Sequence, residues 1–206
     1  MQLEDFTNLL PEIYEKGLIV YIGTLIRKKG VLELPEIFEK VQNKFPDAKL
    51  ILIGTDSNDV QTNSTSTWKL MQDKFKTEDL KNVEYVGKIP YEKVKDYIQK
   101  ANLCIFPTFA ETLGMVTIES MAMQKAVVNS NIGWAQELIV DEQSGFLVHP
   151  ANHNLYAQRI LELLKDPELT LETGKKARLR VEEKFDIKKL VKDNIEFYAK
   201  FINAKG

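Results

Sequence analysis

Residues 103–122 read LCIFPTFAETLGMVTIESMA. The first four are apolar and stop at a proline, which is typical of a buried strand in a parallel sheet. A short loop with a single glycine, Gly114, follows, and apolar residues then recur at the spacing of a helix. A strand, a short loop and a helix start predict an α/β sheet that offers a ligand crevice at the loop.

Two glutamates, Glu111 and Glu119, stand on either side of the predicted helix start. The first-turn amides of a helix lack partners within it and lie at the positive end of its dipole, which suits a phosphate. Eight helical residues separate the two Cα atoms by about 12 Å. Glycosidase carboxylates lie roughly 5 to 9.5 Å apart, so hydrolysis is disfavoured. A nucleotide-sugar fits better, although the spacing also allows two solvated glutamates on an amphipathic helix.

Other apolar runs along the chain alternate with stretches of helical periodicity. The runs predict strands over residues 18–23, 49–54, 83–87 and 126–129. Helices are predicted over residues 31–44, 68–75, 91–100, 152–164, 169–184 and 187–202. This alternation predicts an α/β fold with a doubly wound parallel sheet and right-handed connections.

The composition is that of a globular domain, with 206 residues of which 44% are apolar and 28% charged. A net charge of −2 gives no general attraction to nucleic acid, so no such partner is expected. The single cysteine, Cys104, excludes an internal disulfide and is expected to be inert core. Because no membrane span or signal peptide is recognisable, we expect a cytoplasmic protein. His149 and His153 lack metal-site spacing, so we expect both at the surface and no metal.

A second ligand segment, GTLIRKKG over residues 23–30, follows the first predicted strand. Its glycines allow close backbone approach, and its three cations suit a phosphate. Neither a P-loop nor a Gly-x-Gly-x-x-Gly motif is present, which disfavours a dinucleotide site. A solvated basic loop is the alternative interpretation.

The pattern Pro-Thr-x-x-Glu-x-x-Gly-x-x-x-x-Glu-x-Met-Ala over residues 107–122 resembles the signature of the family 4, group 1 retaining glycosyltransferases. The resemblance is to their C-terminal, donor-binding domain, a Rossmann-like half of the two-domain GT-B architecture. It implies that Glu111 reaches the donor sugar and that Glu119 binds the ribose hydroxyls. Backbone amides near Gly114 are implied to meet the sugar and the distal phosphate.

Residues 23–30 are similar to the family's Gly-Arg-Leu-x-x-x-Lys-Gly loop, with Lys29 at the lysine position. Thr24 stands where the family has arginine, so half of the usual diphosphate clamp is missing; Arg27 or Lys28 could take its place. The resemblance implies donor binding by Gly23, Thr24, Lys29, Lys88, Ile89, Glu111, Thr112, Leu113, Gly114, Met115 and Glu119. It implies catalytic roles for Glu111, which orients the sugar, and for Lys29, which stabilises the growing phosphate charge.

Further family marks lie between residues 124 and 150. Trp134 replaces the second glycine of a Gly-Gly pair; it could narrow the sugar pocket, but we expect it to be packed in the interior. Residues 141–150 follow the family order and give a short sixth strand near Phe146, hence a sheet of about six strands.

The resemblance divides the chain into a linker or N-terminal helix (1–17), a nucleotide-sugar-binding domain (18–185) and a C-terminal crossover helix (186–206). That helix carries an apolar face, part of which we expect to lack a partner in this chain. The face comprises Ile187, Leu190, Val191, Ile195, Tyr198, Phe201 and Ile202. A two-domain enzyme also needs an N-terminal acceptor domain. We therefore expect an isolated C-terminal half that binds donor weakly and transfers nothing alone.

The implied reaction is retaining transfer of a sugar from a UDP-, GDP- or ADP-sugar to an acceptor hydroxyl, in glycan or surface polysaccharide synthesis. It implies no metal and no cofactor, and it allows peripheral membrane association of the full-length enzyme. Two alternatives remain open. One is a phosphorylase or epimerase on the same scaffold, and the other is a non-catalytic nucleotide-binding module, which the Thr24 and Trp134 departures favour. The sequence does not specify base, sugar or acceptor.

Overall fold

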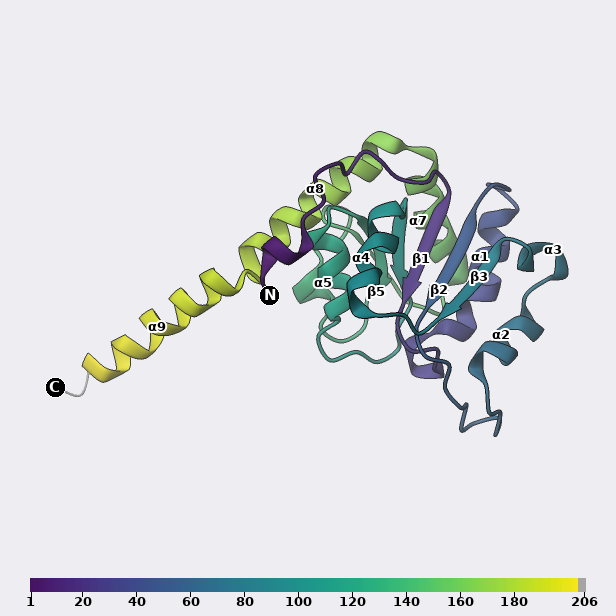
Figure 1. The fold of residues 1–206 in the computed structure, drawn as a ribbon, viewed down its shortest axis with the longest axis horizontal. Helices are drawn as coiled ribbons and strands as arrows, with labels where there is room; N and C mark the ends of the chain where they lie inside the picture. The colour runs from purple at the N-terminus through teal and green to yellow at the C-terminus, as the bar shows by residue number, and fades with distance from the viewer. Residues whose placement is uncertain (204–206) are drawn as a thin grey trace.

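A computed structural model describes residues 1–203 of the protein, and the side chains of residues 1–200. Six parallel strands form one sheet in the order β3-β2-β1-β4-β5-β6 (Figure 1). They are β1 Leu18–Ile22, β2 Lys49–Ile53, β3 Val83–Gly87, β4 Leu103–Phe106, β5 Ala126–Ser130 and β6 Phe146–Val148. The predicted parallel, doubly wound sheet of about six strands is confirmed.

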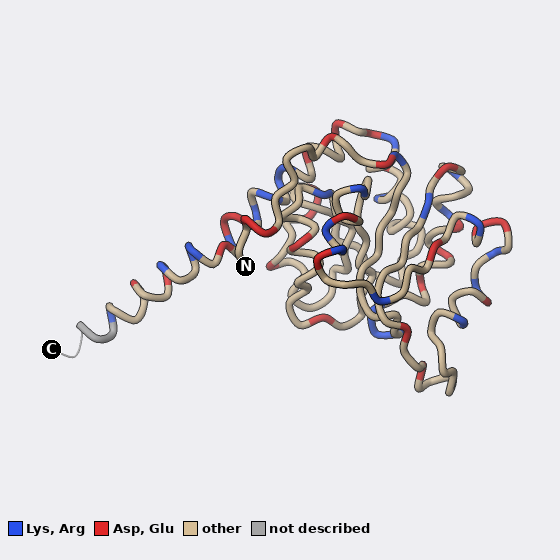
Figure 2. The backbone as a smooth tube through the Cα atoms, viewed as in Figure 1, with Lys and Arg blue, Asp and Glu red and all other residues tan. Residues whose placement is uncertain are grey.

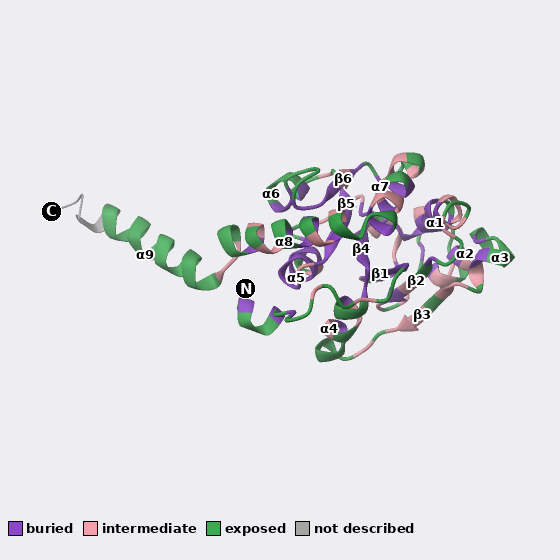
Figure 3. Ribbon diagram, turned by 90° about the horizontal axis from the view of Figure 1, so that it is seen from above, coloured by how far each residue is buried: buried purple, intermediate pink, exposed green. Residues whose placement is uncertain are grey.

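The helices cover both faces of the sheet (Figure 3). They are α1 Leu34–Gln42, α2 Thr67–Lys74, α3 Thr77–Leu80, α4 Tyr91–Lys100, α5 Met115–Ala122, α6 Ala135–Leu138, α7 His153–Lys165, α8 Pro167–Lys184 and α9 Ile187–Asn203. One apolar core joins the sheet to α1, α2 and α7, and a second joins it to α4, α5 and α8. The sequence did not reveal α3 and α6, because four residues are too few to show a helical period.

The strand order reverses between β1 and β4, so the loops that follow these two strands meet at the same edge of the sheet. Three groups of the second loop donate hydrogen bonds to the carbonyl oxygen of Lys28. The backbone N–H groups of Phe109 and Ala110 lie 2.8 and 3.2 Å from it, and the Thr108 hydroxyl 3.2 Å. The two segments singled out in the sequence are therefore fastened together.

The N-terminus lies against the junction between α8 and α9 (Figure 1). The Met1 amine donates to the carbonyl of Phe185 at 2.7 Å, and the Ile187 amide donates to the carbonyl of Met1 at 3.1 Å. From there α9 extends away from the body of the fold (Figure 1). Its apolar side chains at Ile187, Leu190, Val191, Ile195 and Tyr198 are 40% to 64% exposed.

Exposure of these residues agrees with the expectation that part of the face lacks a partner in this chain. The side chains of Phe201 and Ile202 lie outside the described residues. Within the described part of the chain, no helix is both long and apolar enough to cross a membrane. Lys and Arg residues are scattered among Asp and Glu residues over the whole fold (Figure 2).

Lys125 is a buried cation at the start of β5. Its side chain is 2% exposed, its ammonium makes no hydrogen bond within the described residues, and the Tyr14 ring centroid lies 5.5 Å away. Burial lowers the pKa of Lys125 to about 8. Because the unfolded chain binds this proton more tightly, burial of the charged amine lowers the free energy of unfolding. This loss of stability is complete below pH 8 and diminishes as the pH rises towards 10.5.

We therefore expect Lys125→Met to raise the free energy of unfolding by about 2 kcal/mol at pH 7. The gain should be smaller at pH 9.5, where the wild-type amine is largely neutral. Urea denaturation at both pH values measures it, and the exposed Lys44→Met is the control, expected to change stability little. A loss of stability in Lys125→Met at pH 7, or a gain independent of pH, would contradict this account.

Candidate functional site

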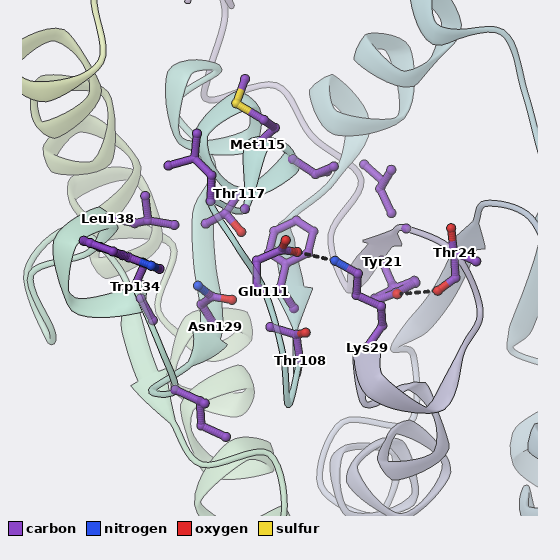
Figure 4. A pocket seen from close by; sticks show the side chains of 18 residues that line it. Tyr21, Thr24, Lys29, Thr108, Glu111, Met115, Thr117, Asn129, Trp134 and Leu138 are labelled. Atoms are coloured by element: carbon purple, nitrogen blue, oxygen red, sulfur yellow. Dashed lines mark hydrogen bonds and ion pairs between the residues drawn. The ribbon is translucent and has the colours of Figure 1, made fainter. Parts of the chain in front are cut away.

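A cavity of about 240 Å³ opens where the ends of β1, β4 and β5 meet the start of α5 (Figure 4). Gly23, Thr24 and Lys29 line it from the loop after β1. The loop after β4 and the first turn of α5 contribute Thr108, Glu111, Leu113, Gly114, Met115, Val116 and Thr117. The structure thus brings together seven of the predicted site residues, Gly23, Thr24, Lys29, Glu111, Leu113, Gly114 and Met115.

Lys29 and Glu111 face each other across the cavity and form an ion pair (Figure 4). Their side chains are 25% and 29% exposed, so a ligand can still reach both groups. The Thr112 amide donates to the other Glu111 carboxylate oxygen at 2.9 Å. Burial alone would raise the pKa of Glu111, but the hydrogen bonds from Lys29 and Thr112 outweigh it, and this pKa lies below its usual value. Glu111 is therefore an anion at neutral pH.

The first turn of α5 is open to a ligand. Gly114 precedes the helix with a φ of +73°, and no side chain caps the helix start. The backbone N–H groups of Met115, Val116 and Thr117 donate no hydrogen bond within the described residues. Three unpaired donors at the positive end of a helix dipole can bind phosphate oxygens.

Thr24 presents its backbone at the opposite side of the cavity. The buried Tyr21 hydroxyl donates to the carbonyl of Thr24 at 3.2 Å, which fixes the start of this loop. Burial, and then the negative charge of Glu111, raise the pKa of Tyr21. Tyr21 is therefore a neutral hydrogen-bond donor at the cavity wall.

Arg27 does not point into the cavity. Its guanidinium makes two hydrogen bonds, of 2.8 and 2.7 Å, to the carboxylate of Asp59, which is 2% exposed. The bonds from Arg27 and Thr62 hold the pKa of Asp59 below its usual range. Lys28 is exposed and offers the loop only its carbonyl. The prediction that Arg27 or Lys28 could replace the absent arginine is therefore wrong; among the lining residues only Lys29 is a cation.

Glu119 lies outside the cavity. It is 4% exposed, and one carboxylate oxygen accepts a hydrogen bond from the hydroxyl of Tyr91 at the start of α4. The other oxygen, Oε2, is buried with no partner in the described part of the chain. Burial raises the pKa of Glu119, and Tyr91 and Lys95 only partly oppose this. The side chain of Glu119 faces α4. The sequence had suggested that both glutamates border one ligand site, but only Glu111 lines the cavity.

The predicted base-binding residues Lys88 and Ile89 lie in the β3–α4 loop, and Pro90 separates them from Tyr91 at the start of α4. Neither lines the cavity, and the side chain of Thr112 does not line it either. The predicted residues therefore fall into two groups. One surrounds Lys29 and Glu111, and the other follows the β3–α4 loop to Glu119.

Trp134 lines the cavity and is 62% exposed, so the expectation of interior packing is wrong. Gly133, with a φ of +65°, precedes it, and α6 starts directly after it. Sequence reasoning also missed Asn129, a lining residue at the end of β5 that is 4% exposed. A signal was available, because a polar residue at the carboxyl end of a parallel strand lies at the edge that binds ligands.

The profile of the family described as glycosyl transferases group 1 matches residues 8–180. The chain belongs to this family. Trehalose synthase of Pyrococcus horikoshii is 28% identical over 93% of this chain and 45% of its own length. The capsular polysaccharide biosynthesis glycosyltransferase CapM of Staphylococcus aureus is 29% identical over 90% of this chain and 48% of its own.

Among solved structures, sucrose-phosphate synthase of Thermosynechococcus elongatus superposes with a TM-score of 0.79 at 26% identity. The match covers 99% of this chain and 51% of that one. This group 1 glycosyltransferase chain thus spans about half the length of the curated relatives it matches.

The two histidines of this glycosyltransferase chain lie apart from the cavity lining. His149 is exposed, whereas His153 is half-buried between Glu33 and Glu36 at 2.7 and 2.8 Å, so the surface position predicted for it is only partly correct. Within residues 1–200, no group of three or more His, Cys, Asp or Glu side chains is placed to hold a metal ion. Cys104 is buried in β4, and burial raises the pKa of its thiol to about 11, so it is unreactive.

Proposed function

We propose that this chain is the donor-binding half of a retaining glycosyltransferase, which moves a sugar from a nucleotide-diphospho-sugar to an acceptor hydroxyl. The observation that carries the proposal is the Lys29–Glu111 pair beside the uncapped start of α5. A cation and three free amides match a diphosphate, and a carboxylate next to them matches sugar hydroxyls.

In this reaction the bond between the sugar and the diphosphate breaks, the acceptor oxygen bonds to the same sugar carbon, and its proton passes to the departing diphosphate, on which negative charge grows. Lys29 and the amides of Met115 to Thr117 would stabilise that charge without reorganising, which is electrostatic catalysis. Glu111 would accept hydrogen bonds from the sugar and orient it. Gly23 and Thr24 would offer backbone atoms to the diphosphate. The acceptor would approach from a domain outside these 206 residues.

The nucleoside end of the donor would lie along the β3–α4 loop, with the base near Lys88 and Ile89 and the ribose at Glu119. The ribose hydroxyls would take over the hydrogen bond that Tyr91 now donates and give the buried Oε2 a partner. Because Tyr91 is 57% exposed, its side chain has room to turn outwards. An unpaired buried carboxylate oxygen is costly, so this exchange favours binding.

Saturation-transfer NMR and calorimetry with UDP, GDP, ADP and their glucose conjugates test the proposal. Glu119→Ala should weaken nucleotide binding about tenfold, because the ribose hydroxyls lose the carboxylate that accepts their hydrogen bonds. Glu111→Ala should leave nucleotide affinity intact and remove the preference for the sugar conjugate. Glu92→Ala, an exposed carboxylate next to Tyr91, is the control and should change neither.

If no nucleotide binds at millimolar concentration, or if the Glu111 and Glu119 variants both retain wild-type affinity for every donor, the proposal is wrong. The same titration separates it from a non-catalytic nucleotide-binding module, which binds nucleotide without preference for a sugar conjugate. Thr24 in place of arginine and the Tyr91 hydroxyl on Glu119 favour that second candidate. We place the full-length enzyme in cytoplasmic glycan or surface polysaccharide synthesis.

A further inference from the structure

At one end of the cavity lie side chains to which the proposed function assigns no role. Beyond Glu111, the cavity continues towards α6, where Thr117, Asn129 and Trp134 line it (Figure 4). Thr117 comes from α5, Asn129 from the end of β5 and Trp134 from the residue before α6. Three elements therefore place a hydroxyl, an amide and an indole around one space.

Asn129 is the most constrained of these residues. Its side chain is 4% exposed, and its amide oxygen is buried without a hydrogen-bond partner in the described structure. Its amide nitrogen also donates to none of the described residues but, unlike the oxygen, is not among the fully buried unpaired atoms. Tyr156 fixes the strand beside it by donating to the carbonyl of Val128 at 2.6 Å. A largely buried amide with no hydrogen-bond partner is rare, and a ligand hydroxyl that accepts a hydrogen bond from its nitrogen gives the amide that partner.

Thr117 adds a second polar group to the same floor. It is 3% exposed, lies in the first turn of α5, and its hydroxyl makes no hydrogen bond within residues 1–200. In Figure 4 this hydroxyl points into the cavity between Asn129 and Glu111. A hydroxyl can both donate and accept, as can the carboxamide, so the pair matches the hydroxyls of a sugar.

Trp134 forms the side wall at this end, and Ile132 and Leu138 line the cavity beside it. An aromatic wall across from a polar floor suits a pyranose ring, whose C–H face packs on the indole while its hydroxyls reach the floor. The charged residues that line the cavity restrict the class of sugar that can bind. Lys29 is the only cation among the lining residues and is paired with Glu111, so a sugar carboxylate would meet a carboxylate with no free counter-charge.

We propose that Thr117, Asn129 and Trp134 form the sugar subsite of the donor pocket and select a neutral hexose that keeps a hydroxyl towards Asn129. The inference rests on the proposed function and adds the substrate class. Trp134 determines specificity by packing on the sugar ring. Asn129 contributes to specificity because its amide has no hydrogen-bond partner when a deoxy-sugar binds, which disfavours that analogue.

The test compares, for the nucleotide that binds best, the free diphosphate with its glucose, deoxyglucose and glucuronate conjugates. The ratio of the dissociation constants of diphosphate and glucose conjugate is the gain from the sugar. Asn129→Ala and Trp134→Ala should each lower this gain about tenfold and leave the affinity for the free diphosphate unchanged. Asn131→Ala, an exposed asparagine in the same loop that does not line the cavity, should change neither.

A second measurement does not depend on these variants. Trp68→Phe leaves Trp134 as the only tryptophan, and Trp68 packs on Tyr85 away from the cavity. The glucose conjugate should then shift the emission of Trp134 more than the free diphosphate does.

Each outcome is decisive. Failure of every nucleotide to bind overturns the proposed function itself. Nucleotide binding with an unchanged sugar gain in both variants, or without a sugar-dependent emission shift, overturns the subsite alone. Glucuronate or deoxyglucose conjugates that bind as tightly as the glucose conjugate overturn the preference for a neutral, hydroxylated hexose.

Discussion

Gly30→Ala is expected to lower the free energy of unfolding by about 4 kcal/mol, a large share of the stability of an ordinary domain. Gly30 has a φ of +69°, which disfavours any side chain. A Cβ atom there would lie 1.7 Å from the carbonyl oxygen of Pro107 and 2.7 Å from its carbonyl carbon. Because both obstacles are backbone atoms, the loops must separate to make room.

Gly87→Ala is the matched control. Gly87 has a similar φ of +80°, and nothing lies within 4 Å of the Cβ that alanine would add. The free energy of unfolding of Gly87→Ala should therefore fall by only about 1 kcal/mol, from backbone strain alone. Urea denaturation compares the two. Equal losses would show that the contact between Gly30 and Pro107 does not matter.

The same substitution should also weaken nucleotide binding, because Gly30 follows Lys29 directly and Pro107 begins the loop that carries Glu111. Separating the loops would break the hydrogen bonds that converge on the Lys28 carbonyl. It would also pull Lys29 away from Glu111.

Lys29→Met is expected to weaken binding of a nucleoside diphosphate about a hundredfold, or about 2.7 kcal/mol. Methionine keeps most of the side-chain length but removes the one cation that lines the described cavity. Glu111 would then face the diphosphate without a counter-charge. The loss should be smaller for the free nucleoside, which has no phosphate to bind.

Lys28→Met is the control for this substitution, because Lys28 is the neighbouring exposed cation and does not line the cavity. Calorimetry at two salt concentrations should show little change for it. The pKa of Glu111, followed by NMR, should rise in Lys29→Met, because a hydrogen bond that lowers it is lost. If both lysine variants weaken binding equally, the general charge of the loop, rather than Lys29 itself, holds the phosphate.

The strands were predictable because a parallel sheet covered on both faces requires continuous apolar runs, and β1, β4 and β5 are buried along their whole length. The cavity could be placed for a related reason. Glycine-containing loops that follow parallel strands lie at the carboxyl edge of the sheet, and the resemblance indicated which two loops meet.

The errors concern side-chain directions. The sequence left Arg27 open as a substitute for the absent arginine, because its partner, Asp59, lies in a polar loop and no local pattern reveals this long-range contact. Trp134 was assigned to the interior because α6 is too short to show in the sequence. For Glu119, the spacing gave its distance from Glu111 but not its rotation about the axis of α5, which turns it towards Tyr91.

The hydrogen bonds that converge on the Lys28 carbonyl also bear on how donor preference could be redesigned. Random libraries that vary Gly30 would mostly yield destabilised clones, since any side chain there meets the Pro107 backbone and forces the two loops apart. The side chains of Asn129 and Trp134 make no hydrogen bond to another loop in the described structure. Saturation mutagenesis at these two positions should therefore give a higher fraction of folded enzymes with altered sugar choice.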